Sequence, residues 1–89
     1  MGYEWITTAL AALVGVEAYE VLQALGADRK RPVPASSEGV RLLTLWSRSG
    51  AGRPLIVTLR HKSGLDWWIV GARDMKPDEL AEFEAWEAK

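Results

Sequence analysis

The chain has 89 residues, with eleven Lys and Arg, twelve Asp and Glu, one His and no Cys. This length allows a single domain over residues 1–89 with a small core. The absence of Cys and the single His exclude disulfide bonds, thiolate nucleophiles and zinc sites built from Cys or from several His. We therefore expect no metal and no cofactor.

The net charge of −1 conceals an uneven distribution along the chain. Residues 1–26 contain three Glu and no Lys or Arg, whereas residues 27–76 contain ten Lys and Arg against four acidic residues. Residues 77–89 contain five acidic residues and one Lys. The basic middle keeps nucleic acid among the expected partners. An acidic C-terminal helix would pack favourably beside a basic sheet and could shield part of it, or its acids could simply suit a solvated helix face.

Targeting and membrane signals are missing from the printed sequence. The apolar run Thr8–Val16 is too short to span a bilayer, and it has neither a basic leader nor a cleavage site. We expect no membrane association and a cytoplasmic location.

The first half of the chain predicts a short edge strand at Tyr3–Ile6, followed by two short helices that meet at a glycine. The first helix ends at Gly15, and the second covers Val16–Leu25. Residues 27–38 contain two Pro and two Ser and show no periodicity, so they predict a loop.

The second half predicts three strands and a helix. Val40–Ser47, Pro54–Arg60 and Asp66–Ala72 are rich in β-branched and aromatic residues, and short Gly-containing turns connect them as an antiparallel meander. A final helix begins at Pro77. The expected fold is α+β in the order (β)ααβββα, with a three- to four-stranded antiparallel sheet and helices packed on one face.

Strict alternation along these strands divides their side chains between two faces of the sheet. The expected core face contains Leu43, Leu45, Leu55, Val57, Leu59, Trp68, Val70 and Ala72. The opposite face contains Thr44, Trp46, Arg48, Thr58, Arg60, Trp67 and Arg73. Because Arg pairs with phosphates while bases stack on aromatic rings, this opposite face is typical of a surface for single-stranded RNA.

Two groups of candidate site residues follow from this surface. We expect RNA-binding contacts from Arg29, Lys30, Arg31, Arg41, Trp46, Arg48, Arg53 and Trp67. RNA cleavage requires a 2′-hydroxyl to attack its own 3′ phosphate, with cations that stabilise the developing charge. Arg60 and Arg73, at the ends of adjacent strands, are the catalytic candidates for that role. His61 joins them because His is the residue type best suited to proton transfer near neutral pH.

The order of several short motifs is similar to that of a known family. These motifs are Glu38 with Arg41 near the first strand of the meander, Gly52-Arg53 and Arg60 on the second, Val70–Arg73 on the third, and Glu79 with Phe83 on the last helix. Upstream, Trp5 and Leu13–Glu17 fit an early strand and a helix corner. The set resembles BrnT-type toxins, which are small RelE-like ribonucleases of type II toxin–antitoxin systems, and covers most of the chain.

The resemblance implies a ribonuclease that a small antitoxin protein neutralises by covering the basic face of the sheet. The chain departs from the family pattern where Val14, Leu13 and Phe83 stand in place of His, Lys and Tyr. Trp46 stands where the family usually has Gly. Any chemistry that the His, Lys and Tyr perform in the family is therefore missing here.

Two other functions stay open at this point. A non-catalytic relative would use its Trp and Arg face to bind a protein partner or a second copy of the chain, forming a homodimer. A small module could also bind RNA or DNA without cleaving it. Exposed Arg residues on a sheet often serve only solubility and edge protection, and a His next to a turn is more often an ordinary surface residue.

Overall fold

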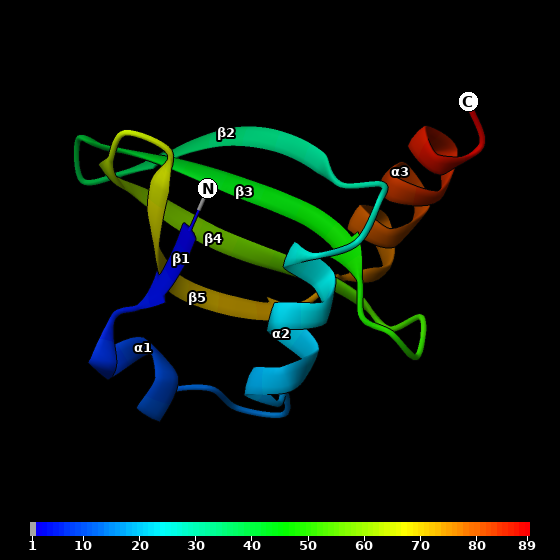
Figure 1. Cartoon of the computed structure of the whole chain (residues 1–89). Coiled ribbons are helices and arrows are strands. Elements are labelled where there is room, and N and C mark those ends of the chain that lie inside the picture. Colours follow the sequence, from blue (N-terminus) through cyan, green and yellow to red (C-terminus); the bar gives the residue numbers. More distant parts are fainter. Residues whose placement is uncertain (1) are drawn as a thin grey trace.

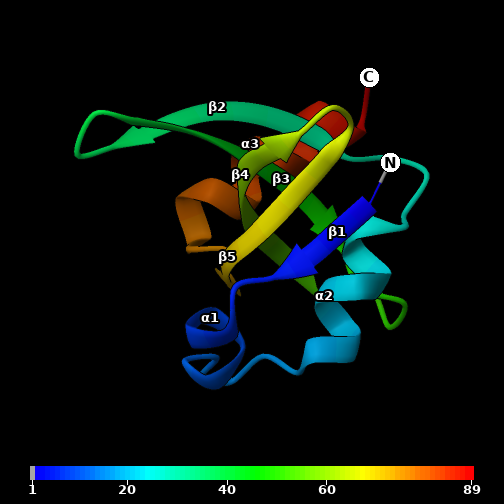
Figure 2. The same ribbon diagram turned by 60° about the vertical axis from the view of Figure 1, so that its left-hand side comes forward.

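The computed structural model describes residues 2–89 and shows a five-stranded sheet between helices on both of its faces (Figures 1 and 2). The elements in chain order are β1 (Gly2–Trp5), α1 (Thr7–Ala11), α2 (Ala18–Leu25), β2 (Arg31–Ser37), β3 (Val40–Arg48), β4 (Pro54–Ser63), β5 (Asp66–Asp74) and α3 (Pro77–Glu87). The strand order across the sheet is β1-β5-β4-β3-β2. The α+β class is confirmed, but the sheet has more strands than predicted.

The predicted meander is confirmed, since β3, β4 and β5 are antiparallel neighbours in sequence order. Gly52 and Gly64 lie in its two turns with φ angles of 89° and 53°, which glycine adopts without strain. The predicted N-terminal edge strand is also confirmed as β1. It pairs parallel to β5, however, so the sheet is mixed rather than purely antiparallel.

The prediction of a loop over residues 27–38 is wrong, because Arg31–Ser37 forms the edge strand β2 and pairs with β3 along its whole length. Proline has no amide hydrogen to donate, so Pro32 and Pro34 fit an edge strand at positions whose nitrogen points away from the neighbour. The two prolines therefore leave this edge with fewer free donors for another strand.

Two helices precede β2, as predicted. α2 ends at Gly26 as expected, and at its start the Glu17 amide donates to a carboxylate oxygen of Glu20 at 3.1 Å. α1 is shorter than predicted, since the chain leaves the helix after Ala11 and turns through Gly15, where φ is 73°. No helix within residues 2–89 is long and apolar enough to cross a membrane.

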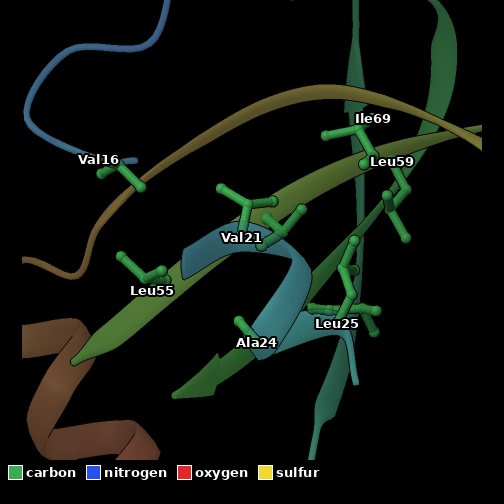
Figure 3. Packing of buried hydrophobic residues seen from close by; sticks show 9 residues of the cluster. Val16, Val21, Ala24, Leu25, Leu55, Leu59 and Ile69 are labelled. Atoms are coloured by element: carbon green, nitrogen blue, oxygen red, sulfur yellow. The ribbon is translucent and has the colours of Figure 1, made fainter. Parts of the chain in front are cut away.

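The helices do not share one face of the sheet, and that prediction is wrong (Figure 2). We name the two faces after α2 and α3. The larger core lies on the α2 face and contains Val16, Val21, Ala24, Leu25, Leu45, Leu55, Val57, Leu59 and Ile69 (Figure 3). A smaller core lies on the α3 face and contains Trp46, Ile56 and Phe83, with Val33, Met75 and Trp86 against them. The face predicted to be polar thus has its own apolar centre, and this centre binds α3.

A bulge disturbs the alternation in β5. The register shifts between Thr58 and Leu59 of β4, and Val70 is the extra residue on β5. As a result Trp67 packs against the core of the α2 face, whereas Trp68 lies on the α3 face. The predicted faces of the two tryptophans are therefore reversed, because strict alternation cannot account for an inserted residue.

Candidate functional site

α3 covers one end of the α3 face through a single fully buried side chain. Phe83 is 0% exposed and lies against Trp46 and Ile56 of the sheet. The ring of Trp86 stacks on Phe83 with 5.6 Å between the ring centroids. Figure 1 shows α3 near one end of the strands, while the hairpins that join β2 to β3 and β4 to β5 extend away from it.

Acidic side chains of α3 bind arginines of the sheet. The distances are 2.6 Å from Arg73 to Glu79, 3.2 Å from Arg31 to Glu82 and 2.7 Å from Arg48 to Glu87. Arg48 and Arg73 each donate from two nitrogens to the two oxygens of one carboxylate, which is the strong bidentate geometry. The acidic helix therefore shields part of the basic sheet, which was one of the two alternatives that its charge suggested.

These contacts keep the carboxylates charged. Hydrogen bonds from Arg73 lower the pKa of Glu79 to about 2 from an ordinary value of 4.5, with a further contribution from the Lys76 amide. Hydrogen bonds from Arg48 likewise lower the pKa of Glu87. The guanidinium groups of Arg73 and Arg48 therefore stabilise the charged forms of Glu79 and Glu87.

Three more of the predicted RNA-binding cations hold the fold together. Arg29 donates to the main-chain oxygen of Glu87 at 2.7 Å and lies over the ring of Trp86. Lys30 donates to the main-chain oxygen of Leu25 at the end of α2. Arg53 binds Asp74 at 2.8 Å and Glu20 at 3.0 Å, and thereby connects the turn between β3 and β4 to β5 and to α2.

The structure does not bring the predicted RNA-binding residues together as a free surface. Ion pairs and hydrogen bonds within the fold already hold the side chains of Arg29, Lys30, Arg31, Arg48 and Arg53. Trp46 is buried at 8% exposure, and Trp67 lies on the α2 face. Arg41 is exposed, but the register places it next to Ser36 and out of phase with Leu42 and Trp46, so it belongs to the α2 face. The predicted RNA surface is therefore distributed over both faces, and α3 occupies its centre.

The three catalytic candidates are also apart. Arg60 lies opposite Trp68, and Arg73 lies opposite Ile56 of β4. Ile56 and Arg60 are four positions apart on β4, which is about 13 Å along the strand. Arg73 is held by Glu79. His61 lies opposite Trp67 on the α2 face, and its Nε2 is 2.9 Å from the main-chain oxygen of Gly64. Because β4 and β5 are antiparallel, the ends at which Arg60 and Arg73 lie are opposite ends of the pair.

The rest of the α3 face is uncovered, and we call it the open half. It consists of Leu42, Thr44, Thr58, Arg60, Trp68 and Gly71. Arg60 is exposed, and its side chain forms no hydrogen bond or ion pair with any other residue of the described range 2–89. Trp68 is half-buried beneath Lys62, whose ammonium group is 4.7 Å from the ring centroid and 2.8 Å from Glu4.

Gly71 gives the open half a flat spot. Its φ angle lies outside the left-handed region, and a Cβ added to it would meet no atom within 4 Å. Neither backbone conformation nor packing inside the fold therefore requires glycine here. A glycine within a strand often marks a place where another backbone approaches closely. Sequence reasoning missed this residue, although a Gly inside an apolar strand was the available signal.

Two further surface features were not predicted. Four apolar side chains of the helical corner are exposed: Leu10 at 45%, Val14 at 88%, Tyr19 at 62% and Leu22 at 51%. A shallow hollow of about 430 Å³ lies beside the β2–β3 hairpin and is lined by Pro34, Ala35, Ser36, Arg41 and Leu42. Within residues 2–89, no three His, Asp or Glu side chains are grouped as metal ligands.

Known proteins give no independent identification. A comparison with models of protein families and a comparison with curated proteins both find no match to this chain. The resemblance to BrnT-type toxins therefore stays a prediction that depends on the order and spacing of its motifs. Function has to be inferred from the surface itself.

Proposed function

We propose that the chain is a binding module for a protein partner and that its docking surface is the open half of the α3 face. The observation that carries this proposal is the contrast between the two halves of one sheet face. At the covered end, Arg31, Arg48 and Arg73 are bound by the acids of α3. In the open half, Arg60 has no such partner and lies next to the half-buried Trp68.

The composition of the open half favours protein over RNA. RNA affinity grows with the number of phosphates that unpaired cations neutralise, and Arg60 is the one such cation that the described residues place on this face. A single unpaired Arg beside a Trp, on a patch where Lys62 and Glu4 pair with each other, is instead typical of the centre of a protein interface. The ribonuclease prediction depended on several neighbouring free cations, so we rank it behind protein binding.

A photo-crosslinking residue in place of Leu42, at the margin of the open half, tests this proposal in the cells from which the chain comes. We expect one covalent adduct that protease removes and nuclease does not. The matched control carries the same residue in place of Leu22, which is exposed on α2, and should not give that adduct. Arg60→Ala should lower the yield of the adduct about tenfold, as is usual for an interface hot spot.

Two results would contradict the proposal. An adduct that nuclease removes would mean that RNA occupies the open half, which would restore RNA binding or cleavage as the leading function. The absence of any adduct from position 42, in a chain that is folded and expressed, would mean that the surface has no partner under those conditions of growth.

A further inference from the structure

We infer that the partner of the open half is an acidic amphipathic helix, which docks beside α3 in the way that α3 itself docks. This inference rests on the proposed function and adds the chemical class of the partner. The chain already contains one example of such a helix bound to this same sheet face, so the requirements for binding can be compared residue by residue.

α3 shows what the face requires of a helix. Its one fully buried side chain, Phe83, fills the space over Trp46 and Ile56, and Trp86 packs beside it. Ion pairs lie at the margins of this apolar contact. Glu79 and Glu87 lie one turn before and one turn after Phe83 and bind arginines at opposite sides of the contact. The contact thus combines a large apolar residue at its centre with an acid about one turn away on each side.

The open half offers the same complementary groups. Trp68 is the aromatic platform, corresponding to Trp46, and Arg60 lies directly opposite it on the neighbouring strand. Lys62, two residues after Arg60 on β4, lies over the Trp68 ring and pairs with the exposed Glu4. An incoming carboxylate would therefore find the unpaired guanidinium of Arg60, with the paired Lys62 close by, which matches an acidic helix better than a neutral or basic one.

The shape of the open half also fits a helix. Thr58 lies opposite both Thr44 and Gly71 in the central part of the sheet, so two threonines and a glycine form a row across the strands. The empty space over Gly71 lets a partner backbone come close to the sheet. A second copy of the chain is a poorer match, because its acidic helix is already held on its own sheet by three ion pairs.

The test uses a synthetic peptide with the sequence of residues 76–89, acetylated and amidated, added to the full ¹⁵N-labelled chain. We expect saturable shifts of the Trp68 indole and Gly71 amide signals. Arg60→Glu should lower the affinity of the chain for the peptide about tenfold or more. Arg41→Glu makes an equal charge change on the α2 face and should not lower this affinity. A peptide with Gln in place of its three ion-pairing Glu should also bind about tenfold more weakly.

Gly71→Val tests the shape argument. A β-branched residue suits a strand, so the variant should fold, as the dispersion of its amide spectrum will show, and it should abolish the shifts by filling the flat spot. Gly71→Ala makes the smallest addition at the same place. It should reduce the peptide-induced shifts in part, even if valine disturbs the bulge.

Failure of the inference can be told apart from failure of the proposed function. Shifts that Arg60→Glu and Gly71→Val leave unchanged, or no shifts at these signals, would overturn the acidic-helix inference. If the crosslinked adduct at position 42 is nevertheless a protein, the proposed function stands with a different class of partner. If a uridine decanucleotide shifts the same signals more strongly than the peptide does, both are overturned.

Discussion

Replacing Phe83 with alanine should lower the free energy of unfolding by about 3–5 kcal/mol, because it removes the one fully buried side chain of α3 and leaves a cavity over Trp46 and Ile56. A chain of 89 residues has a total stability of roughly 4–13 kcal/mol, so this loss is a large fraction of it. Urea denaturation followed by tryptophan fluorescence measures the change.

Ala85→Gln is the control for the Phe83 variant. Ala85 is exposed on the same helix, and glutamine is a good helix former, so the control should change stability by less than about 0.5 kcal/mol. Equal stability of the Phe83→Ala variant and the natural chain would show that α3 does not pack on the sheet. In that case the sheet arginines would be free and the RNA surface would regain its predicted extent.

The pair Leu59→Ala and Thr58→Ala should give the second large effect. Leu59 is 0% exposed in the core of the α2 face, and its truncation should cost about 2–5 kcal/mol. Thr58 is its neighbour on the same strand but belongs to the open half, so its truncation should cost at most about 1 kcal/mol. Chemical denaturation of both variants provides the comparison. Similar costs at the two positions would mean that the open half is covered and would argue against a docking surface there.

Much of the fold follows from local sequence signals. The meander is predictable because Gly-containing turns separate runs of β-branched and aromatic residues, and α3 is predictable from Pro77 and the acids that follow it. The end of α2 at Gly26 is predicted for the same kind of reason. In each of these cases the structure is determined by residues close together in the sequence.

The features that were mispredicted depend on how the strands pair and where they lie in the sheet, which local sequence signals do not show. Pro32 and Pro34 disfavour most strands, and they are tolerated because β2 lies at the edge of the sheet, which local sequence does not reveal. The bulge at Val70 is visible only once β4 and β5 are paired. The parallel pairing of β1 with β5 likewise joins segments more than sixty residues apart.

The prediction of the candidate site failed because the sequence did not show which face of the sheet α3 covers. The charge of residues 77–89 suggested an acidic helix near a basic sheet, but the low polarity of Trp46 and Ile56 decides which face it covers. Once α3 is placed, two of the arginines expected to bind RNA, Arg31 and Arg48, and the catalytic candidate Arg73 become its ion-pair partners. Gly71 and Trp68 become part of the candidate site only because they lie in the open half, which α3 leaves uncovered.

The central claim is that carboxylates hold Arg31, Arg48, Arg53 and Arg73, whereas the side chain of Arg60 on the α3 face is unpaired. Hydrogen exchange of the arginine Nε–H groups, measured by NMR at neutral pH, tests it directly. Arg48 and Arg53 donate from Nε to carboxylates at 2.9 and 2.8 Å, so their signals should exchange slowly, whereas the signal of Arg60 should exchange as fast as that of an unfolded chain. If Arg48 exchanges as fast as Arg60, or if Arg60 is equally protected, the account is contradicted.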